Sequence, residues 1–183
     1  MRGFRRRRLS GRRQSWLFVI GLIAAVAVVA GLPYALAGDD ARDPGYVEYE
    51  TALDLPPTAA LATAAVLDVV DGDTIDVELD GRRVRVRYFG VDTPERGEGC
   101  YREAVTRNEE LLGETVLLLP DDRERDSFGR LLRYVFTAER ISIDATLVAE
   151  GFGRAWREDG AFRDQIVALE ETAEGEGRGC LWR

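Results

Sequence analysis

The sequence predicts an all-β or α+β domain, in which five short strands close a barrel and about three helices are appended to it. Five short β-rich runs occupy residues 64–70, 74–79, 82–89, 115–119 and 131–136. One helical stretch follows the third run and two more follow the fifth. This order is expected of an OB-fold, a five-stranded barrel with a helix after its third strand.

The first three runs are predicted to form a β-meander. Asp80-Gly81 separates residues 74–79 from residues 82–89 and is typical of a tight hairpin turn. The helical spacing of residues 101–112 ends at Gly113. In the C-terminal part we expect two further helices.

These C-terminal helices are placed by their boundary signals. Asp144 is expected to cap a short helix that runs to Glu150 and is ended by Gly151. Residues 161–173 have the spacing of a third helix.

The N-terminal part, residues 1–37, is predicted to be a targeting segment. Seven arginines precede 22 uncharged residues, Trp16 to Ala37, which are enough to cross a bilayer as a helix. A cleaved signal peptide and an uncleaved membrane anchor both fit, and either places the rest of the chain outside the cytoplasm. Residues 38–63, acidic and proline-containing, are expected to be a linker, and residues 64–183 the folded domain.

Composition restricts the available chemistry. The chain has no histidine and two cysteines, and all 25 of its basic residues are arginines. Imidazole bases, Ser-His-Asp triads, histidine-ligated zinc and four-thiolate sites are therefore excluded. Carboxylates and arginines remain, and these bind hard cations through oxygen and phosphates through guanidinium.

Three stretches concentrate acids and arginines: VDGDT at residues 70–74, RYFGVDTPE at 87–95 and DSFGR at 126–130. Each alone is typical of an ordinary turn or loop, but their joint order and separation are specific. On these motifs, residues 64–182 resemble the staphylococcal nuclease (thermonuclease) family. The resemblance implies an OB-fold and calcium-dependent hydrolysis of phosphodiester bonds in DNA, with RNA as a further candidate, to 3′-phosphate products.

The first two motifs predict a Ca²⁺ site. Asp73 follows the turn at Gly72, and Asp92 is expected to end the third strand, so adjacent strands would bring both carboxylates to one rim of the barrel. Oxygen ligands alone favour Ca²⁺ over Zn²⁺. The resemblance implies side-chain ligands from Asp73 and Asp92 and a backbone carbonyl ligand from Thr93, with Asp71 orienting a metal-bound water.

Glu95 is the hypothesised general base, because it lies three residues beyond Asp92. Arg87 and Arg130 are expected to bind opposite sides of the phosphate and stabilise its developing charge. Asp126 is expected to fix the loop that carries Arg130.

The third motif departs from the family pattern, with Ser127 and Phe128 where the nucleases have lysine and tyrosine. The tyrosine pair that the family has after its second helix is also not evident, and Trp156 and Arg157 fall in that region. Phe128, Trp156 and Arg157 are candidate substrate contacts, since aromatic rings stack on bases and arginine binds phosphate. The alternative for Trp156 is a core position. Cys100 and Cys180 are predicted to form a disulfide in an oxidising compartment, the alternative being two buried thiols.

The charge of the body opposes nucleic-acid binding. Beyond residue 38, 18 arginines face 33 acids, a net charge of −15, which resembles proteins adapted to molar salt. In molar salt the Debye length falls to about 3 Å, so we expect weak, salt-tolerant binding by a monomer. Two alternatives stay open: an OB-fold module that binds nucleic acid or a protein without cleaving, and a membrane-anchored structural domain.

Overall fold

The structure is a computed structural model, and it describes residues 53–55 and 59–183. The predicted signal peptide or anchor at residues 1–37 and most of the predicted linker lie outside the described residues. Within the part of the chain that the structure describes, no helix is long and apolar enough to cross a membrane.

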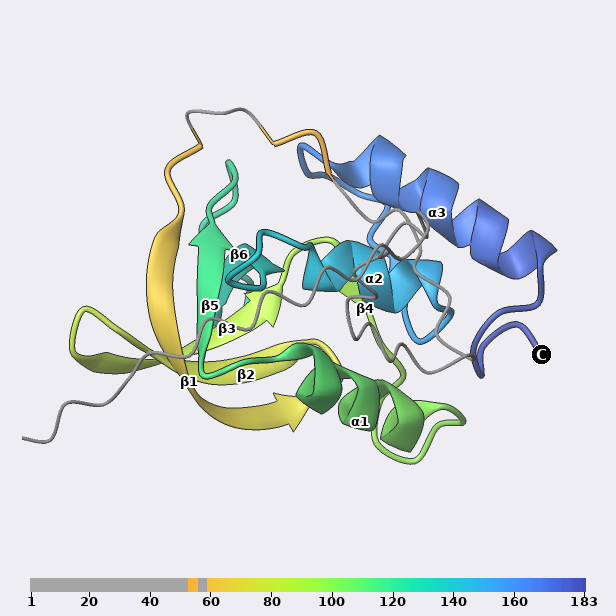
Figure 1. Cartoon of the computed structure of the whole chain (residues 1–183), viewed down its shortest axis with the longest axis horizontal. Helices are drawn as coiled ribbons and strands as arrows, with labels where there is room; N and C mark the ends of the chain where they lie inside the picture. The colour runs from red at the N-terminus through yellow and green to blue at the C-terminus, as the bar shows by residue number, and fades with distance from the viewer. Residues whose placement is uncertain (1–52, 56–58) are drawn as a thin grey trace, which may run out of the picture. The chain divides into compact units, whose positions relative to one another are not determined.

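Five strands close a barrel (Figure 1). They are β1 (Ala62–Asp71), β2 (Thr74–Leu79), β3 (Arg82–Tyr88), β5 (Thr115–Leu119) and β6 (Leu131–Phe136). Their order around the barrel is β1-β2-β3-β6-β5, and β3 and β6 run parallel while the other neighbours run antiparallel. The predicted fold class is confirmed.

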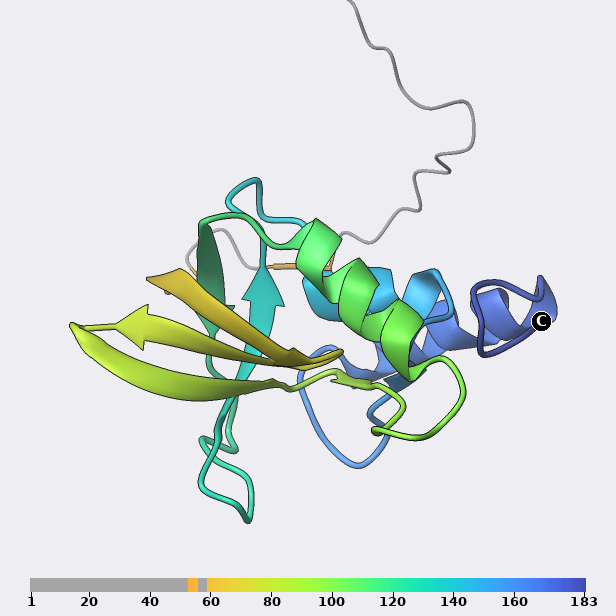
Figure 2. The same ribbon diagram turned by 90° about the horizontal axis from the view of Figure 1, so that it is seen from below.

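The hairpin of β2 and β3 has the predicted turn. Asp80 and Gly81 both have positive φ, 52° and 70°, as a two-residue hairpin turn of the favoured twist requires. In Figure 2 this turn points away from the three helices. Because successive strand residues face opposite sides, Val86 is buried inside the barrel and Arg85 and Arg87 lie on its outer face.

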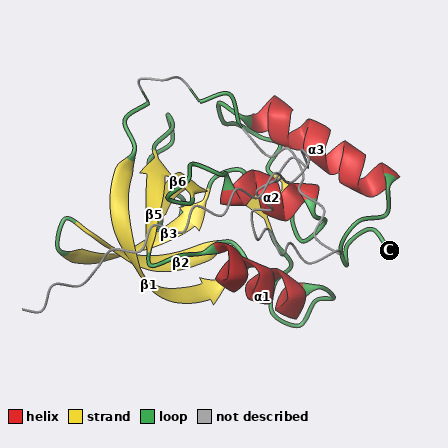
Figure 3. Cartoon of the chain, viewed as in Figure 1, coloured by secondary structure: helices red, strands yellow, loops and turns green. Residues whose placement is uncertain are grey.

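Three helices lie on one side of the barrel (Figure 3). They are α1 (Tyr101–Leu111), α2 (Ile143–Ala149) and α3 (Arg163–Gly175). The prediction that Asp144 caps α2 was wrong: Ser142 is the cap, and its hydroxyl accepts from the Ala145 N–H at 3.1 Å. Asp144 is fully buried, and its carboxylate instead accepts from two backbone N–H groups outside the helix, those of Gly90 and Val135.

Two further strands were not predicted. The two-residue strands β4 (Val91–Asp92) and β7 (Arg154–Ala155) pair antiparallel. The expectation that Asp92 ends the third strand was therefore wrong, because β3 stops at Tyr88 and the chain turns before β4. Asp92 is opposite Arg154 instead.

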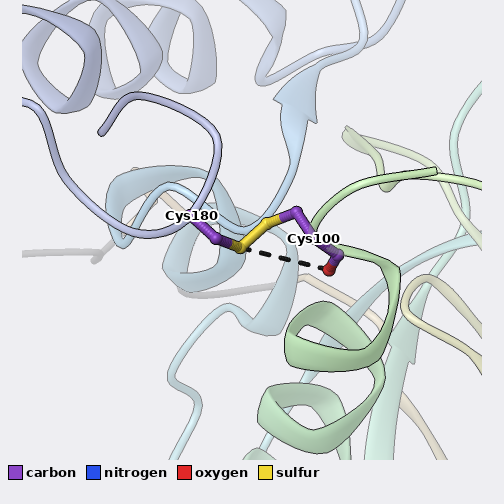
Figure 4. The surroundings of a disulfide bond; sticks show 2 residues. All are labelled: Cys100 and Cys180. Carbon is purple, nitrogen blue, oxygen red and sulfur yellow. Dashed lines mark hydrogen bonds between the residues drawn. A yellow bond between two sulfur atoms is a disulfide. The ribbon is translucent and has the colours of Figure 1, made fainter.

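The C-terminal segment is fastened to the start of α1. Cys100 and Cys180 form the expected disulfide, with their Cα atoms 5.5 Å apart (Figure 4). A second close approach needs a glycine, since a Cβ at Gly179 would overlap the Gly151 carbonyl oxygen. At the other end of the described chain Leu53, from the predicted linker, packs in the core.

Candidate active site

Asp73 lies in the turn between β1 and β2 and is 5% exposed. Its Oδ2 accepts hydrogen bonds from the Thr93 N–H at 2.7 Å and the Thr93 hydroxyl at 2.9 Å. Its Oδ1 lies 3.0 Å from Arg87 Nε and accepts from the Thr74 hydroxyl at 3.1 Å. Burial raises the pKa of Asp73 to about 6, although Arg87 and the hydrogen bonds from Thr93 lower it.

Gly72 makes this approach possible. A Cβ at Gly72 would lie 2.6 Å from the Thr93 hydroxyl oxygen, so any larger residue would push Thr93 away from Asp73. Asp71, on the other side of the glycine, accepts the Asp73 N–H at 3.2 Å through Oδ1. The DGDT sequence thus shapes the turn and also provides the carboxylate.

Arg87, on β3 opposite Thr74, joins the two predicted metal ligands. Its Nε faces Asp73, and its Nη2 donates to Asp92 Oδ1 at 2.6 Å. Its Nη1 donates to the carbonyls of Tyr88 at 2.7 Å and Val91 at 2.5 Å. The Arg87 side chain is 11% exposed, and its guanidinium contacts four acceptor groups.

Asp92 is the solvent-exposed member of this group of residues. Its side chain is 56% exposed, and it borders a cavity of about 310 Å³ with Thr93, Glu98 and Arg154. The Asp73 and Asp92 carboxylates are connected through Arg87. Among residues 53–55 and 59–183, no three or more His, Cys, Asp or Glu side chains gather closely enough to form a metal cluster by themselves.

Arg130 reaches the same turn from the loop between β5 and β6. Its Nε donates to Asp126 Oδ2 at 2.5 Å, and Asp126 Oδ1 accepts the backbone N–H groups of Phe128 and Arg130. Nη1 of Arg130 lies 3.5 Å from the Thr74 hydroxyl, which donates to Asp73. Thr74 therefore connects the two predicted phosphate-binding arginines through Asp73.

A buried network that was not predicted supports the turn from α1. Asn108 is fully buried; its Oδ1 accepts from the Tyr88 hydroxyl at 2.8 Å and its Nδ2 donates to the Asp71 carbonyl at 3.0 Å. The sequence contains a signal for it, because Asn108 lies four residues after Ala104 on the buried face of α1.

Glu95 is not brought to these groups in the structure. It is exposed, its N–H donates to Glu98 Oε2 at 2.8 Å, and its carbonyl accepts from the Glu98 N–H. Within the described residues, no contact joins its carboxylate to Asp73, Arg87 or Arg130.

The candidate substrate contacts divide into two groups. Phe128 is 84% exposed, and the Arg130 guanidinium carbon lies 5.5 Å from its ring centroid. Trp156 is half-buried against the core and donates to Asp159, and Arg157 pairs with the buried Glu170 of α3. In this conformation Trp156 and Arg157 do not contact the site around Asp73.

Fold and site together define an OB-fold domain with acids and arginines at the rim of its barrel. The family model of staphylococcal nuclease homologues matches residues 85–183, and the chain belongs to this family.

Several named nucleases are similar to the chain. Thermonuclease of Staphylococcus hyicus is 32% identical over 122 residues, which cover 61% of this chain and 71% of that protein. Endonuclease YncB of Bacillus subtilis (strain 168) is 36% identical over 118 residues, 58% of this chain and 56% of that protein. SPbeta prophage-derived endonuclease YokF of the same organism is also 36% identical, over 40% of its length. The chain thus spans about half the length of these two endonucleases.

Proposed function

We propose that this chain is a Ca²⁺-dependent nuclease that hydrolyses phosphodiester bonds of DNA, with RNA as a second candidate substrate, and leaves 3′-phosphate ends. One observation carries the proposal: Arg87 lies between Asp73 and Asp92, and Arg130 meets the same turn through Thr74. Relatives named as nucleases support it.

The two arginines would bind the scissile phosphate. Guanidinium groups donate parallel hydrogen bonds to phosphate oxygens, and they stabilise charge that develops there in the transition state. Asp73, Asp92 and two carbonyls engage the three nitrogens of Arg87, so binding a phosphate through two N–H groups would require Arg87 to release at least one of these partners. Arg130 is fixed by Asp126 on one side, and only a long contact to Thr74 holds it on the other.

The donor set fits a hard divalent cation. Asp73, Asp92 and the Thr93 carbonyl offer oxygen alone, and the two carboxylates together carry more negative charge than Arg87 between them neutralises. Bound Ca²⁺ would supply positive charge beside the scissile phosphate. Asp71 would position Asp73 through its hydrogen bond to the Asp73 N–H.

Glu95 is proposed to orient or deprotonate the attacking water. It lies on the exposed loop between Asp92 and Cys100, where its carboxylate is accessible to solvent and substrate. Catalytic contacts are often long in ligand-free structures and tighten in the substrate complex. The Glu95→Ala variant tests this role directly.

We further propose that the chain is exported, acts as a monomer and tolerates high salt. The basic, apolar N-terminal segment and the acidic body support these proposals. N-terminal sequencing of the mature protein would distinguish a cleaved signal, with a new terminus near residue 38, from an intact anchor.

The activity test uses the full chain in high salt with DNA and RNA, with Ca²⁺ or a chelator. We expect Ca²⁺-dependent cleavage that Glu95→Ala and Arg87→Ala reduce strongly and that Arg163→Ala, on α3, leaves unchanged. Product ends are identified by phosphatase sensitivity. Cleavage in chelator, or full rates in the first two variants, would contradict the mechanism; binding without cleavage would identify a non-catalytic module.

A further inference from the structure

A groove lies beside the candidate active site, and arginines of β3 line one side of it. Arg83, Arg85 and Arg87 alternate along this strand, so they share its outer face at a spacing of about 6.6 Å. Arg83 and Arg85 line a groove of about 680 Å³, and the loop between β5 and β6 contributes Arg125 and Arg130.

The groove has an excess of positive charge in an otherwise acidic body. Its lining contains four arginines and one acid, Asp76. Arg83 and Arg85 share that carboxylate, each with a nitrogen 2.8 Å from an Asp76 oxygen. Two acids outside the lining also pair with groove arginines, Asp68 with Arg83 at 3.7 Å and Asp126 with Arg130 at 2.5 Å. Arg125 donates to the Gly129 carbonyl at 2.7 Å, and none of the described residues gives it a carboxylate partner. The four arginines thus meet three carboxylates, and one positive charge, that of Arg125, remains for a ligand.

The exposed side chains of the groove suit a single strand. The side chains of Arg83 and Arg85 are 59% and 51% exposed, and because both pair with the buried Asp76, one of them can turn toward a ligand while the other keeps Asp76 paired. Phe128 lines the same groove and presents its ring to solvent. A basic groove that follows the backbone, with an aromatic ring for a base, is the usual means of binding single-stranded nucleic acid without sequence preference.

We propose that this groove binds the sugar-phosphate backbone of single-stranded nucleic acid, at nucleotides next to the scissile phosphate. Arg130 belongs to both sites, because it lines the groove and also reaches Thr74. A strand held at Arg87 would continue along β3 past Arg85 and Arg83. The inference rests on the proposed nuclease function.

The test compares a long and a short substrate. The variant Arg83→Ala/Arg125→Ala is preferred, because Asp76 keeps Arg85 as its partner. With the full chain, we expect kcat/KM on a 20-nucleotide single strand to fall about ten-fold, and that on a dinucleotide to stay unchanged. Arg163→Ala is the matched control, and Arg83→Lys/Arg125→Lys should retain most of the rate. Thermal melts verify that each variant folds.

Binding provides a readout that does not need cleavage. In chelator, the dependence of log K on log salt for labelled single-stranded DNA should become shallower by about 1.4 in the double alanine variant, about 0.7 for each phosphate that an arginine no longer neutralises. The arginines of the N-terminal segment contribute equally to all variants. Poly-glutamate should compete much more weakly than an oligonucleotide.

The outcomes separate this inference from the proposed function. Unchanged long-substrate rates and an unchanged salt slope in a cleaving enzyme would overturn the groove alone. Equal loss on both substrates would overturn it too, since the arginines would then act on the scissile site. Equal competition by poly-glutamate would assign the groove to acidic peptides. A reduced salt slope in a protein that cleaves neither substrate would uphold the groove and refute the nuclease.

Discussion

The two ends of β3 use the same residue type differently. At one end Arg87 is nearly buried, and its three nitrogens contact two carboxylates and two carbonyls. At the other end Arg83 and Arg85 are half-exposed and share Asp76. The strand places all three on one face, but the surroundings decide how firmly each is held. A fixed guanidinium suits transition-state stabilisation, and an adjustable one suits binding to a flexible polymer.

The largest difference between the two ends should appear in catalysis. We expect Arg87→Ala to lower kcat by about 10³-fold or more, because a guanidinium that stabilises a phosphoryl transition state contributes effects of that order. Arg83→Ala should lower kcat/KM on a long strand by only a few-fold. Steady-state kinetics on one DNA substrate tests both. A loss in Arg83→Ala as large as that in Arg87→Ala would remove the distinction.

The Arg87→Ala variant also leaves the Asp73 carboxylate without its positively charged partner, so the folding of this variant must be verified separately. Arg87→Lys retains the charge but not the several directed hydrogen bonds, and we expect it to fold and still lose most of its activity. Recovery of wild-type kcat in the lysine variant would show that charge alone is needed.

The disulfide should support the fixed end of the strand. Cys100→Ser/Cys180→Ser opens a link across 80 residues, which the loop-entropy relation values at up to about 4.5 kcal/mol of unfolding free energy. Because Cys100 follows the loop that carries Asp92 and Glu95, we expect kcat to fall while oligonucleotide binding stays unchanged. Urea unfolding with and without reductant measures the stability. An equal stability of the reduced and oxidised protein would contradict this prediction.

A smaller loss of stability is expected when the buried hydrogen bonds of Asn108, which support the turn at Asp73, are removed. Asn108→Ala leaves the Tyr88 hydroxyl buried without its acceptor, which should cost about 1–3 kcal/mol of unfolding free energy. Adding Tyr88→Phe to Asn108→Ala should recover part of the loss, because no polar hydroxyl then remains unpaired. A double-mutant cycle by chemical denaturation tests this, and strictly additive losses would refute the proposed coupling.

The smallest expected effect is on the pH dependence of the unfolding free energy, and it arises at the end of β3 that carries Arg83 and Arg85. Hydrogen bonds from Arg85, with a further contribution from Arg83, lower the pKa of Asp76 to about 2. A carboxyl group with a lowered folded-state pKa stabilises the fold above its unfolded pKa near 3.8, and this contribution disappears as the pH falls from about 4 to 2. Given the half-exposed arginines, we expect about 1–2 kcal/mol.

Asp76→Asn should therefore flatten the stability profile between pH 4 and pH 2. Glu174→Gln, on α3, is the control and should leave that slope unchanged. Unfolding free energies measured across this range decide the matter, and parallel curves for wild type and Asp76→Asn would contradict the prediction.

Most of the barrel could be predicted from the sequence because its strands alternate and its hairpin has a strong turn signal. Residues 74–79, 115–119 and 131–136 were predicted with the bounds that the structure has. The strands β4 and β7 could not be predicted. Each has only two residues, too few to show a periodicity, and their pairing brings together residues far apart in the chain.

The site was only partly predictable for the same reason. The motifs identified Asp73, Arg87 and Arg130 as candidates by type and order, and the structure connects these three. That Arg87 lies between Asp73 and Asp92, and that Asn108 supports the turn, depends on tertiary packing. The alternation of Arg83, Arg85 and Arg87 can be read directly from the sequence. The sequence does not indicate that Arg125 and Phe128 face these arginines from another loop.

The single parallel pairing of the barrel has a consequence for how the molecule forms. β3 gains β2 as a neighbour through a local hairpin, but it gains β6 only after residues 131–133 are available. During synthesis the strand that carries Arg87 would thus expose unpaired backbone N–H and C=O groups, and such open strand edges promote association between chains. A shortened chain that lacks β6 should accordingly aggregate, and the nascent protein would depend on rapid completion of its barrel.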